Sequence, residues 1–175
     1  MKRNICKICS HELSDEVYYV DFNDICYSKC SNCNLVYQTR INSLDQNTIN
    51  SFYDEKYFKT SYKNPSINLK KRNLQYEFDK KIILKYYQDK KDQSILDYGC
   101  GNGLFLEKFN SNKFGFEVNT SIIKSKKITY LDAQLSSKNT FDLILMRGVI
   151  EHIKDFDTIL KKLFLKLKKN GLFFI

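Results

Sequence analysis

The stretch Ser94–Phe109, SILDYGCGNGLFLEKF, carries the strongest indication of the fold class. It begins with an apolar segment typical of a strand, continues through three alternate glycines and ends in a segment typical of a helix. From Ser94 onward such segments keep alternating, in the order SILDY, GLFLEKF, KFGFEV, SIIKSK, ITYLD, FDLILM, DFDTILKKLFLKLKK and GLFFI. This order predicts an α/β domain with about five parallel strands, joined by helical crossovers into a doubly wound sheet.

The last helix in this pattern has clear signals at both ends. Asp155 can cap its first turn. Lys166, Lys168 and Lys169 suit the negative end of the helix dipole, and Gly171 can terminate the helix. We therefore expect the helix to reach Gly171 and the segment GLFFI to form the last strand.

Composition divides the chain into three parts. We expect residues 1–42 to form a small β module, residues 43–92 a helical connector and residues 93–175 the α/β domain. The connector is expected to be helical over SLDQNTINSFYDEKYF and again over SINLKKRNLQYEFDKKIILKYYQDK. In the second segment, four apolar residues fall at helical spacing and predict one buried face: Ile67, Leu74, Phe78 and Ile82.

The β module holds two pairs of cysteines with metal-binding spacing, Cys6-x2-Cys9 and Cys30-x2-Cys33. Two thiolates three positions apart in a tight turn can bind one ion, and two such pairs complete a tetrahedral site. Four thiolates leave no open position for water, so we expect a structural zinc site in a zinc-ribbon-like module. The metal would supply much of the folding free energy of so short a segment.

The alternatives to this zinc site concern its ligands and its existence. Cys26 and His11 lie close by and could substitute as ligands, and four buried or free cysteines are the alternative to a metal. Disulfides are not expected, because the cytosol keeps thiols reduced. The N-terminus lacks the apolar core of a secretory signal, and no apolar run approaches the roughly 18 residues that suggest a membrane span. We therefore expect a soluble, cytoplasmic protein without a membrane partner.

The net charge of +9 could indicate an acidic partner. Residues 1–45 carry five Lys or Arg against six Asp or Glu, a net charge of −1, which leaves +10 for the remaining residues. Those lysines are mixed with acidic residues and asparagines, which favours a solvated surface over a nucleic-acid interface. No nucleic-acid partner is therefore expected, and the oligomeric state stays open.

The glycine loop reads D-x-G-x-G-x-G, with Asp97 followed by Gly99, Gly101 and Gly103. A nucleotide-type ligand is expected here. Leucines replace the third glycine of the dinucleotide fingerprint, and no Gly-Lys-Ser/Thr follows as in a P-loop. Glu117 ends the second strand, 18 residues after Gly99, where a carboxylate can accept hydrogen bonds from both ribose hydroxyls. The pattern therefore predicts a ligand with a ribose but without a pyrophosphate.

These motifs resemble those of the class I S-adenosylmethionine-dependent methyltransferases, whose first motif reads much like ILDYGCGNG and whose second strand ends in an acid. The resemblance extends through TFDLILMRGVIEHIKDFDTILKKLFLKLKKNGLFFI. With the four cysteines and the segment SFYDEKYF, the layout is similar to zinc-binding methyltransferases of bacterial sugar and natural-product modification. It implies a Rossmann-like domain, S-adenosylmethionine as cofactor and a small-molecule acceptor, with a sugar or sugar nucleotide as the expected substrate.

The same resemblance assigns roles to the residues of the glycine loop. Gly99, Gly101 and Gly103 would let the backbone approach the methionine and ribose portions of the cofactor. Asp97 would orient the loop or bind the cofactor amine, and Glu117 would hold the ribose.

Further residues match the family's cofactor site beyond the second strand. Asp132, in YLDAQL, matches the adenine-edge position, and Met146 and Arg147 would border the cofactor after the fourth strand. His152 is the candidate general base, with a structural role in its loop as the alternative. A subset of the superfamily binds a divalent metal through E-x-x-E-H at this point, but Gly148 replaces the first glutamate, so no catalytic metal is expected.

Two other functions remain open on the sequence. Some rRNA methyltransferases also carry an N-terminal zinc site, although the cysteine module here is net acidic. The family also continues past its fifth strand, whereas this chain stops at GLFFI, so a truncated domain and a non-catalytic cofactor-binding fragment are expected alternatives. The acceptor and the methylated atom are not encoded in any motif.

Overall fold

The computed structural model describes residues 5–6, 8–14, 17–20, 26–38, 45–51, 65–122, 125–132, 135 and 138–175. The chain divides into two compact units, Met1–Thr48 and Ile49–Ile175. Among the described residues, no helix combines the length and the apolar character needed to cross a membrane.

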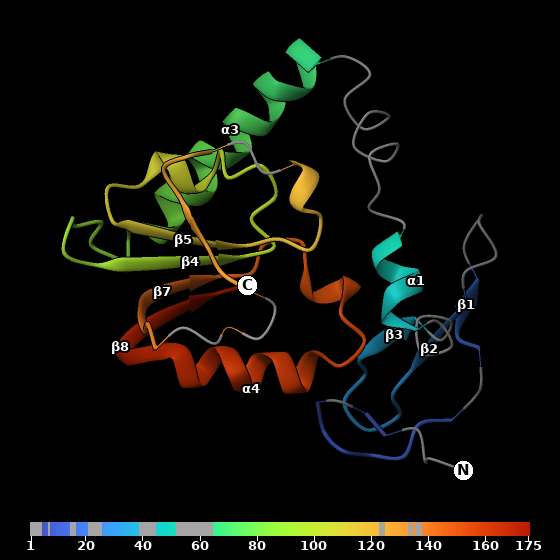
Figure 1. Ribbon diagram of the computed structural model, residues 1–175. Helices are drawn as coiled ribbons and strands as arrows, with labels where there is room; N and C mark the ends of the chain where they lie inside the picture. Colours follow the sequence, from blue (N-terminus) through green and yellow to red (C-terminus); the bar gives the residue numbers. More distant parts are fainter. Residues whose placement is uncertain are drawn as a thin grey trace. The chain divides into compact units, whose positions relative to one another are not determined.

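The first unit contains a three-stranded antiparallel sheet in the order β1-β2-β3, with β1 at Tyr19–Val20, β2 at Cys26–Lys29 and β3 at Val36–Gln38 (Figure 1). β1 and β3 lie within the alternating segments EVYYVDF and NLVYQTR, so the small β module expected in this part of the chain is confirmed. Helix α1, Gln46–Ser51, follows, and the Asp45 carboxylate caps it by accepting a hydrogen bond of 2.9 Å from the backbone N–H of Thr48.

The second unit is built on a five-stranded sheet in the order β6-β5-β4-β7-β8, in which every pairing is parallel. The strands are β4 (Ser94–Tyr98), β5 (Asn112–Phe116), β6 (Thr129–Tyr130), β7 (Phe141–Leu145) and β8 (Leu167–Phe174). The first strand in sequence lies at the centre, and the chain winds outward from it in both directions. The predicted doubly wound α/β fold is confirmed.

Two helices cover opposite faces of this sheet: α3 (Pro65–Ile83) and α4 (Phe156–Lys166) (Figure 1). Alternation along the strands supplies both cores. Ile95 and Leu145 belong to the core on the α3 side, whereas Leu96 and Ile144 belong to the core on the α4 side. The central strands are therefore apolar on both faces, as buried parallel strands are.

The end of α4 differs from the prediction. The helix stops at Lys166, and Lys168, Lys169 and Gly171 lie inside β8 instead of in the last helical turn. Strand pairing to β7 begins directly after the helix, and the Lys168 ammonium reaches the Asp142 carboxylate of that strand at 2.8 Å. These sheet contacts outweigh the helical propensity of the lysines.

The crossover helix predicted after β4 is a short 3₁₀ turn, η2 (Leu106–Lys108). The helix predicted over SIIKSK after β5 includes residues 123 and 124, which lie outside the described residues, and η3 (Thr120–Ile122) lies at its start. After β4, the backbone N–H groups of Asn110 and Ser111 both donate to the Asp89 carboxylate. These contacts fix Asn110 and Ser111 in the turn that leads into β5.

The predicted face of α3 is also wrong. Leu74 and Phe78 are 66% and 64% exposed, Ile82 is half-buried, and the side chain of Ile67 lies outside the described residues. The buried positions are Tyr76 and Ile83, which pack against the sheet. A further helix, the 3₁₀ turn η4 (Ile150–His152), lies between β7 and α4.

Candidate cofactor-binding site

The glycine loop begins where β4 ends, at the carboxyl edge of the sheet. The backbone N–H groups of Gly99 and Cys100 both donate to the carbonyl of Phe116, at 2.8 and 3.0 Å, so the loop is fixed to the end of β5. β5 lies on one side of β4 and β7 on the other, which makes this edge the point where the winding of the sheet reverses. Ligands of doubly wound sheets bind at such a point.

The three glycines of the loop have different surroundings. A Cβ on Gly99 would lie 2.4 Å from Val149, and one on Gly103 would lie 2.4 Å from Ile128, so both positions are closed by packing. Gly101 has a left-handed φ of +56°, and a Cβ there would meet nothing within 4 Å. Gly101 is therefore the glycine whose backbone borders open space.

Glu117 lies beside this open position. One carboxylate oxygen accepts the backbone N–H of Gly101 at 2.8 Å, and the other accepts the backbone N–H of Asn119 at 2.9 Å. Each carboxylate oxygen can accept more than one hydrogen bond, so the side chain is oriented and still able to accept from a ligand. The contact with Asn119 was not anticipated from the sequence.

Asp97 is the buried acid of the site. Its side chain is on β4 and the residue is 3% exposed, and its Oδ1 has no hydrogen-bond partner in the described part of the chain. The pKa of Asp97 is raised to about 7, mainly by burial and to a smaller extent by the Glu117 carboxylate, against the lowering effect of the Arg147 guanidinium. A buried carboxylate oxygen without a partner is costly, and a cationic group would satisfy it.

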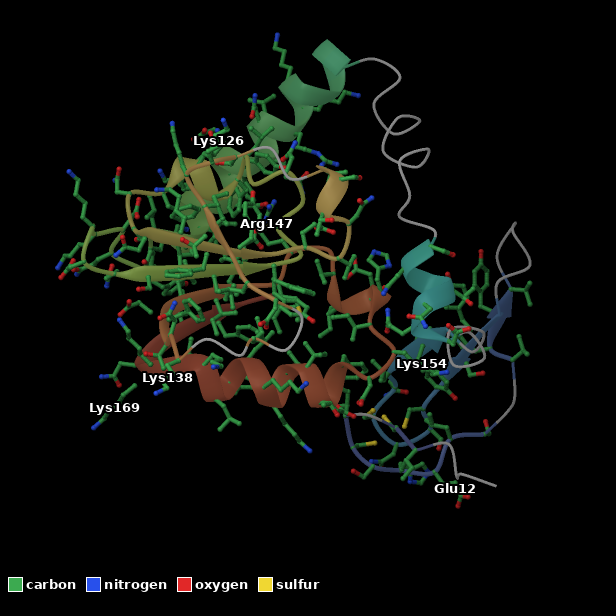
Figure 2. The ribbon with its side chains drawn as sticks, viewed as in Figure 1. Glu12, Lys126, Lys138, Arg147, Lys154 and Lys169 are labelled. Carbon is green, nitrogen blue, oxygen red and sulfur yellow. The ribbon has the colours of Figure 1, made fainter. Side chains whose placement is uncertain are left out.

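Arg147 follows β7 and points toward α3 (Figure 2). Its Nε donates to the Asp79 carboxylate at 3.1 Å and its Nη2 donates to the same oxygen. The guanidinium also lies over the rings of Phe105 and Tyr76, 3.9 and 5.1 Å from their centroids. The sequence had placed Arg147 at the cofactor, but its partner Asp79 was missed.

The remaining predicted residues lie around the same edge. Met146 is fully buried in the core on the α4 side, and Asp132 is exposed just after β6. His152, in η4, has a side chain that is 41% exposed, with its Nε2 3.7 Å from the Glu151 carboxylate. Cofactor contacts for Met146 and Asp132, and a catalytic role for His152, stay predictions.

Comparison with known proteins gives the family. Residues 70–175 match the family model described as "Methyltransferase domain". The chain belongs to this methyltransferase family. The matched residues run from α3 to the end of β8 and do not include the cysteine pairs.

Individual relatives agree with this assignment. The Ubiquinone biosynthesis O-methyltransferase of Pelagibacter ubique (strain HTCC1062) is 35% identical over 100 residues, which cover 49% of this chain and 42% of the relative. The (S)-coclaurine N-methyltransferase of Papaver somniferum is 34% identical over 113 residues, or 54% of this chain and 32% of the relative. The chain thus matches less than half the length of these methyltransferases.

A solved methyltransferase has the same fold. The plantazolicin methyltransferase BpumL, in complex with a monoazolic desmethylPZN analog and SAH, superposes with a TM-score of 0.57 at 21% sequence identity. The match covers 77% of this chain and 58% of that protein. At this identity the comparison supports the fold.

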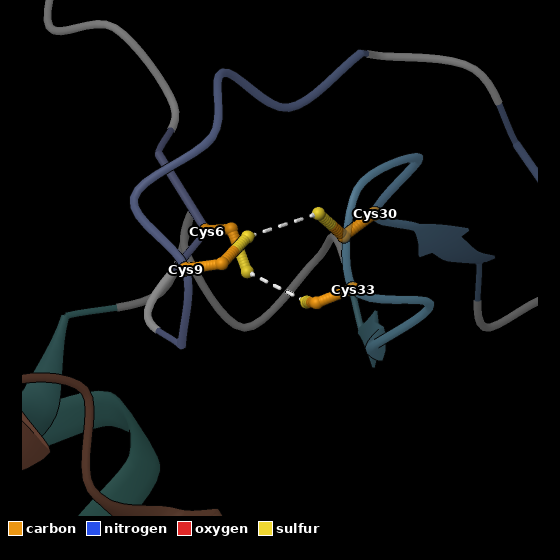
Figure 3. A group of neighbouring side chains, drawn as sticks. All are labelled: Cys6, Cys9, Cys30 and Cys33. Carbon is orange, nitrogen blue, oxygen red and sulfur yellow. Dashed lines mark hydrogen bonds between the residues drawn. The ribbon is translucent and has the colours of Figure 1, made fainter.

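The cysteine pairs come together in the first unit (Figure 3). The Sγ atoms of Cys6 and Cys33 are 3.6 Å apart, as are those of Cys9 and Cys30, and all four sulfur atoms lie within 4.8 Å of one another. Among the described residues, these four cysteines form the group of potential metal ligands. Cys6 and Cys30 are buried, and the other two are half-buried.

The two cysteine turns share one backbone pattern. Cys6 accepts at its carbonyl from the N–H of Ser10, and Cys30 accepts in the same way from Asn34. Ser10 and Asn34 both take left-handed conformations, with φ of 59° and 61°. The two C-x2-C segments thus form similar turns, and their sulfur atoms lie close together.

Hydrogen bonding lowers the pKa of two cysteines in this cluster, Cys6 and Cys9, which favours their thiolates, whereas burial and the neighbouring thiols raise the pKa of Cys33 to about 12. Hydrogen bonds from the Asn32 side chain and from the backbone N–H of His11 lower the pKa of Cys9 to about 6. The thiolate is the form that binds metal. His11 therefore contributes its backbone here, and the side chain of Cys26, the other alternative ligand, lies outside the described residues.

Proposed function

We propose that this chain is the cofactor-binding part of an S-adenosylmethionine-dependent methyltransferase that acts on a small molecule. The observation that carries the proposal is the unpartnered Oδ1 of Asp97, buried beside a glycine loop that is open at Gly101. The cofactor presents an ammonium group and a ribose with two hydroxyls. Asp97 suits the ammonium, and Glu117 has lone pairs for the hydroxyls.

When bound, S-adenosylmethionine supplies an activated methyl group for an in-line displacement. The residues of this chain would hold the cofactor in one orientation, because Glu117 and the glycine loop are themselves fixed by backbone hydrogen bonds. Such positioning contributes on the order of 7 to 11 kcal/mol in favourable cases. His152 is the candidate to accept a proton from a hydroxyl acceptor, an effect of roughly 10²- to 10⁴-fold.

The expected acceptor is a sugar or sugar nucleotide. This finer proposal rests on the combination of four clustered cysteines with a methyltransferase domain, as in the sugar-modifying enzymes that the sequence resembles. Small acceptors also fit the relatives, one of which is named for coclaurine. Labelling of RNA instead would identify the chain as part of an RNA methyltransferase.

The cysteine cluster is proposed to hold a structural zinc ion. Two pairs of sulfur atoms on similar turns, all within 4.8 Å, suit a tetrahedral ion of this size. With four thiolate ligands the ion would have no free position for water or substrate, so its role would be to stabilise the first unit.

Calorimetry tests the cofactor proposal. S-adenosylmethionine should bind the wild type, and Glu117→Gln should weaken binding about tenfold or more, because hydrogen bonds to a charged acceptor are worth roughly 1.5–3 kcal/mol each. Glu107→Gln is the matched control, since Glu107 lies exposed in η2 and should leave affinity unchanged. Tighter binding of NAD than of S-adenosylmethionine would overturn the proposal.

The acceptor class is tested with radiolabelled cofactor. Nucleotide sugars and rRNA are incubated separately with the protein, and transferred label is counted. Label on a nucleotide sugar supports the proposed substrate, whereas label confined to rRNA contradicts it.

A further inference from the structure

Four charged side chains gather on the α3 side of the sheet, at the carboxyl ends of its central strands. Asp97 and Leu145 are directly paired between β4 and β7, and Arg147 follows Leu145 by two residues. Leu145 packs on the α3 side, and Arg147 contacts α3 itself through Asp79. Glu117 joins them from the end of β5, where it influences the ionisation of Asp97.

Arg147 is held firmly in this group. Asp79 accepts hydrogen bonds from two of its nitrogens, and two aromatic rings lie against its guanidinium plane. Its side chain is 16% exposed and that of Asp79 is 17% exposed. The position of the positive charge is therefore fixed by α3 before any ligand arrives, which suits a supporting role better than direct binding.

We propose that Arg147 is a positioning residue that favours the ionised form of Asp97, the form that can receive a cationic group of the cofactor, and that Asp79 limits how strongly Arg147 does so. The identity of that cationic group, the cofactor ammonium, rests on the proposed function. The proposed effect of Arg147 and Asp79 on the ionisation of Asp97 does not depend on the identity of that cationic group.

The electrostatic balance around Asp97 gives the reason. Burial and the Glu117 carboxylate raise the pKa of Asp97 and the Arg147 guanidinium lowers it, with a net value of about 7. The Cys100 thiol of the glycine loop also faces this group, and burial raises its pKa, so it adds no charge. Among the described residues, Arg147 is the charged group that lowers the pKa of Asp97. Asp79 accepts two hydrogen bonds from the same guanidinium, and its negative charge is expected to offset part of that effect.

The ligand-free protein provides the first test. Asp97 is titrated by NMR of ¹³C-labelled aspartate carboxyls, with Asp97→Asn used to assign its signal. Arg147→Met should raise the midpoint by about one pH unit, Asp79→Asn should lower it, and Arg147→Lys should leave it near the wild-type value because the charge is kept. If Arg147 and Asp79 only stabilised the fold, their substitutions would not shift the Asp97 midpoint in opposite directions. Shifts in the same direction, or no shift, in Arg147→Met and Asp79→Asn would therefore overturn the proposal.

Cofactor binding provides the second test. Affinity for S-adenosylmethionine is measured by calorimetry from about pH 5.5 to about pH 9. The pH of half-maximal affinity should follow the same order, highest in Arg147→Met and lowest in Asp79→Asn. Parallel losses of affinity at every pH would contradict the proposed role of Arg147.

The two tests separate the possible failures. If the wild type binds no S-adenosylmethionine, the proposed function fails while the NMR titration still decides the charge relation. If Arg147→Met does not fold, the downward shift in Asp79→Asn and the unchanged midpoint in Arg147→Lys decide it, and absence of the downward shift refutes it.

Discussion

Replacing Asp97 with asparagine should make the ligand-free protein more stable than the wild type at alkaline pH. The carboxylate is 3% exposed and its Oδ1 lacks a partner in the described structure. Ionising it inside the protein therefore costs free energy that a neutral amide of the same shape does not incur. The same change should abolish most of the affinity for S-adenosylmethionine, because the group proposed to meet the cofactor ammonium is gone.

The size of this stability difference follows from the pKa of Asp97 in the unfolded chain and in the folded protein. The unfolded chain releases this proton near the ordinary value of 3.8, whereas the folded protein holds it up to a pKa of about 7. The stability gained from the bound proton is thus fully present below pH 3.8 and is lost as the pH rises through 7. Between about pH 5 and about pH 8 this loss amounts to ~2.5 kcal/mol. The asparagine variant has no proton to lose, so its stability relative to the wild type should rise by that amount.

Urea unfolding of both proteins at the two pH values measures this difference. Any fixed effect of the amide on packing or hydrogen bonding cancels when the two pH values are compared. Asp92→Asn is the matched control, because Asp92 is exposed and its substitution should change stability equally at both pH values. If the relative stability of Asp97→Asn is the same at both pH values, Asp97 is not a buried acid with a raised pKa.

Three further changes test other parts of the molecule. Cys30→Ser should lower the zinc content from about one ion per chain, measured by elemental analysis, whereas Cys100→Ser should leave it unchanged, because Cys100 lies outside the cluster. Gly101→Ala should weaken S-adenosylmethionine binding about tenfold in calorimetry, since a methyl group would enter the open side of the loop; unchanged affinity would place the ligand elsewhere. Tyr87→Phe should cost about 1 kcal/mol in urea unfolding, because its hydroxyl shares a buried 2.7 Å hydrogen bond with Ser111; a cost near zero would show that this bond adds no net stability.

The features predicted from the sequence are those encoded over short distances. The parallel, doubly wound sheet was predicted from the alternation of strand and helix segments, and each of the two cysteine turns is specified within a few residues. The position of Glu117 beside the glycine loop was also predicted, because a parallel neighbour strand must end at the same edge as β4. Local patterns of this kind do not depend on knowing what packs against them.

The features that were missed depend on partners distant in sequence. The apolar spacing of α3 predicted that Leu74 and Phe78 lie on its buried face, but both are exposed. The helix instead turns Tyr76 and Asp79 toward Arg147, whose guanidinium lies over the Tyr76 ring and donates to the Asp79 carboxylate. A count of apolar residues cannot find a face that is held partly by an ion pair. The end of α4 was missed for a similar reason, since pairing with β7 decides where β8 begins.

Two other acids near the central strands, Asp142 in β7 and Asp89 in the loop before β4, show how this chain surrounds structural carboxylates. Asp142 accepts the backbone N–H of Ser94 at 2.7 Å and the Lys168 ammonium at 2.8 Å. Asp89 accepts from both backbone and side chain of Ser111. Structural carboxylates in this protein thus have donors supplied by the chain itself. Asp97 is more deeply buried than either, yet one of its oxygens has no such donor in the described residues. An asparagine would serve the fold at lower cost, and this is the reason we propose that Asp97 meets a cation that arrives with the cofactor.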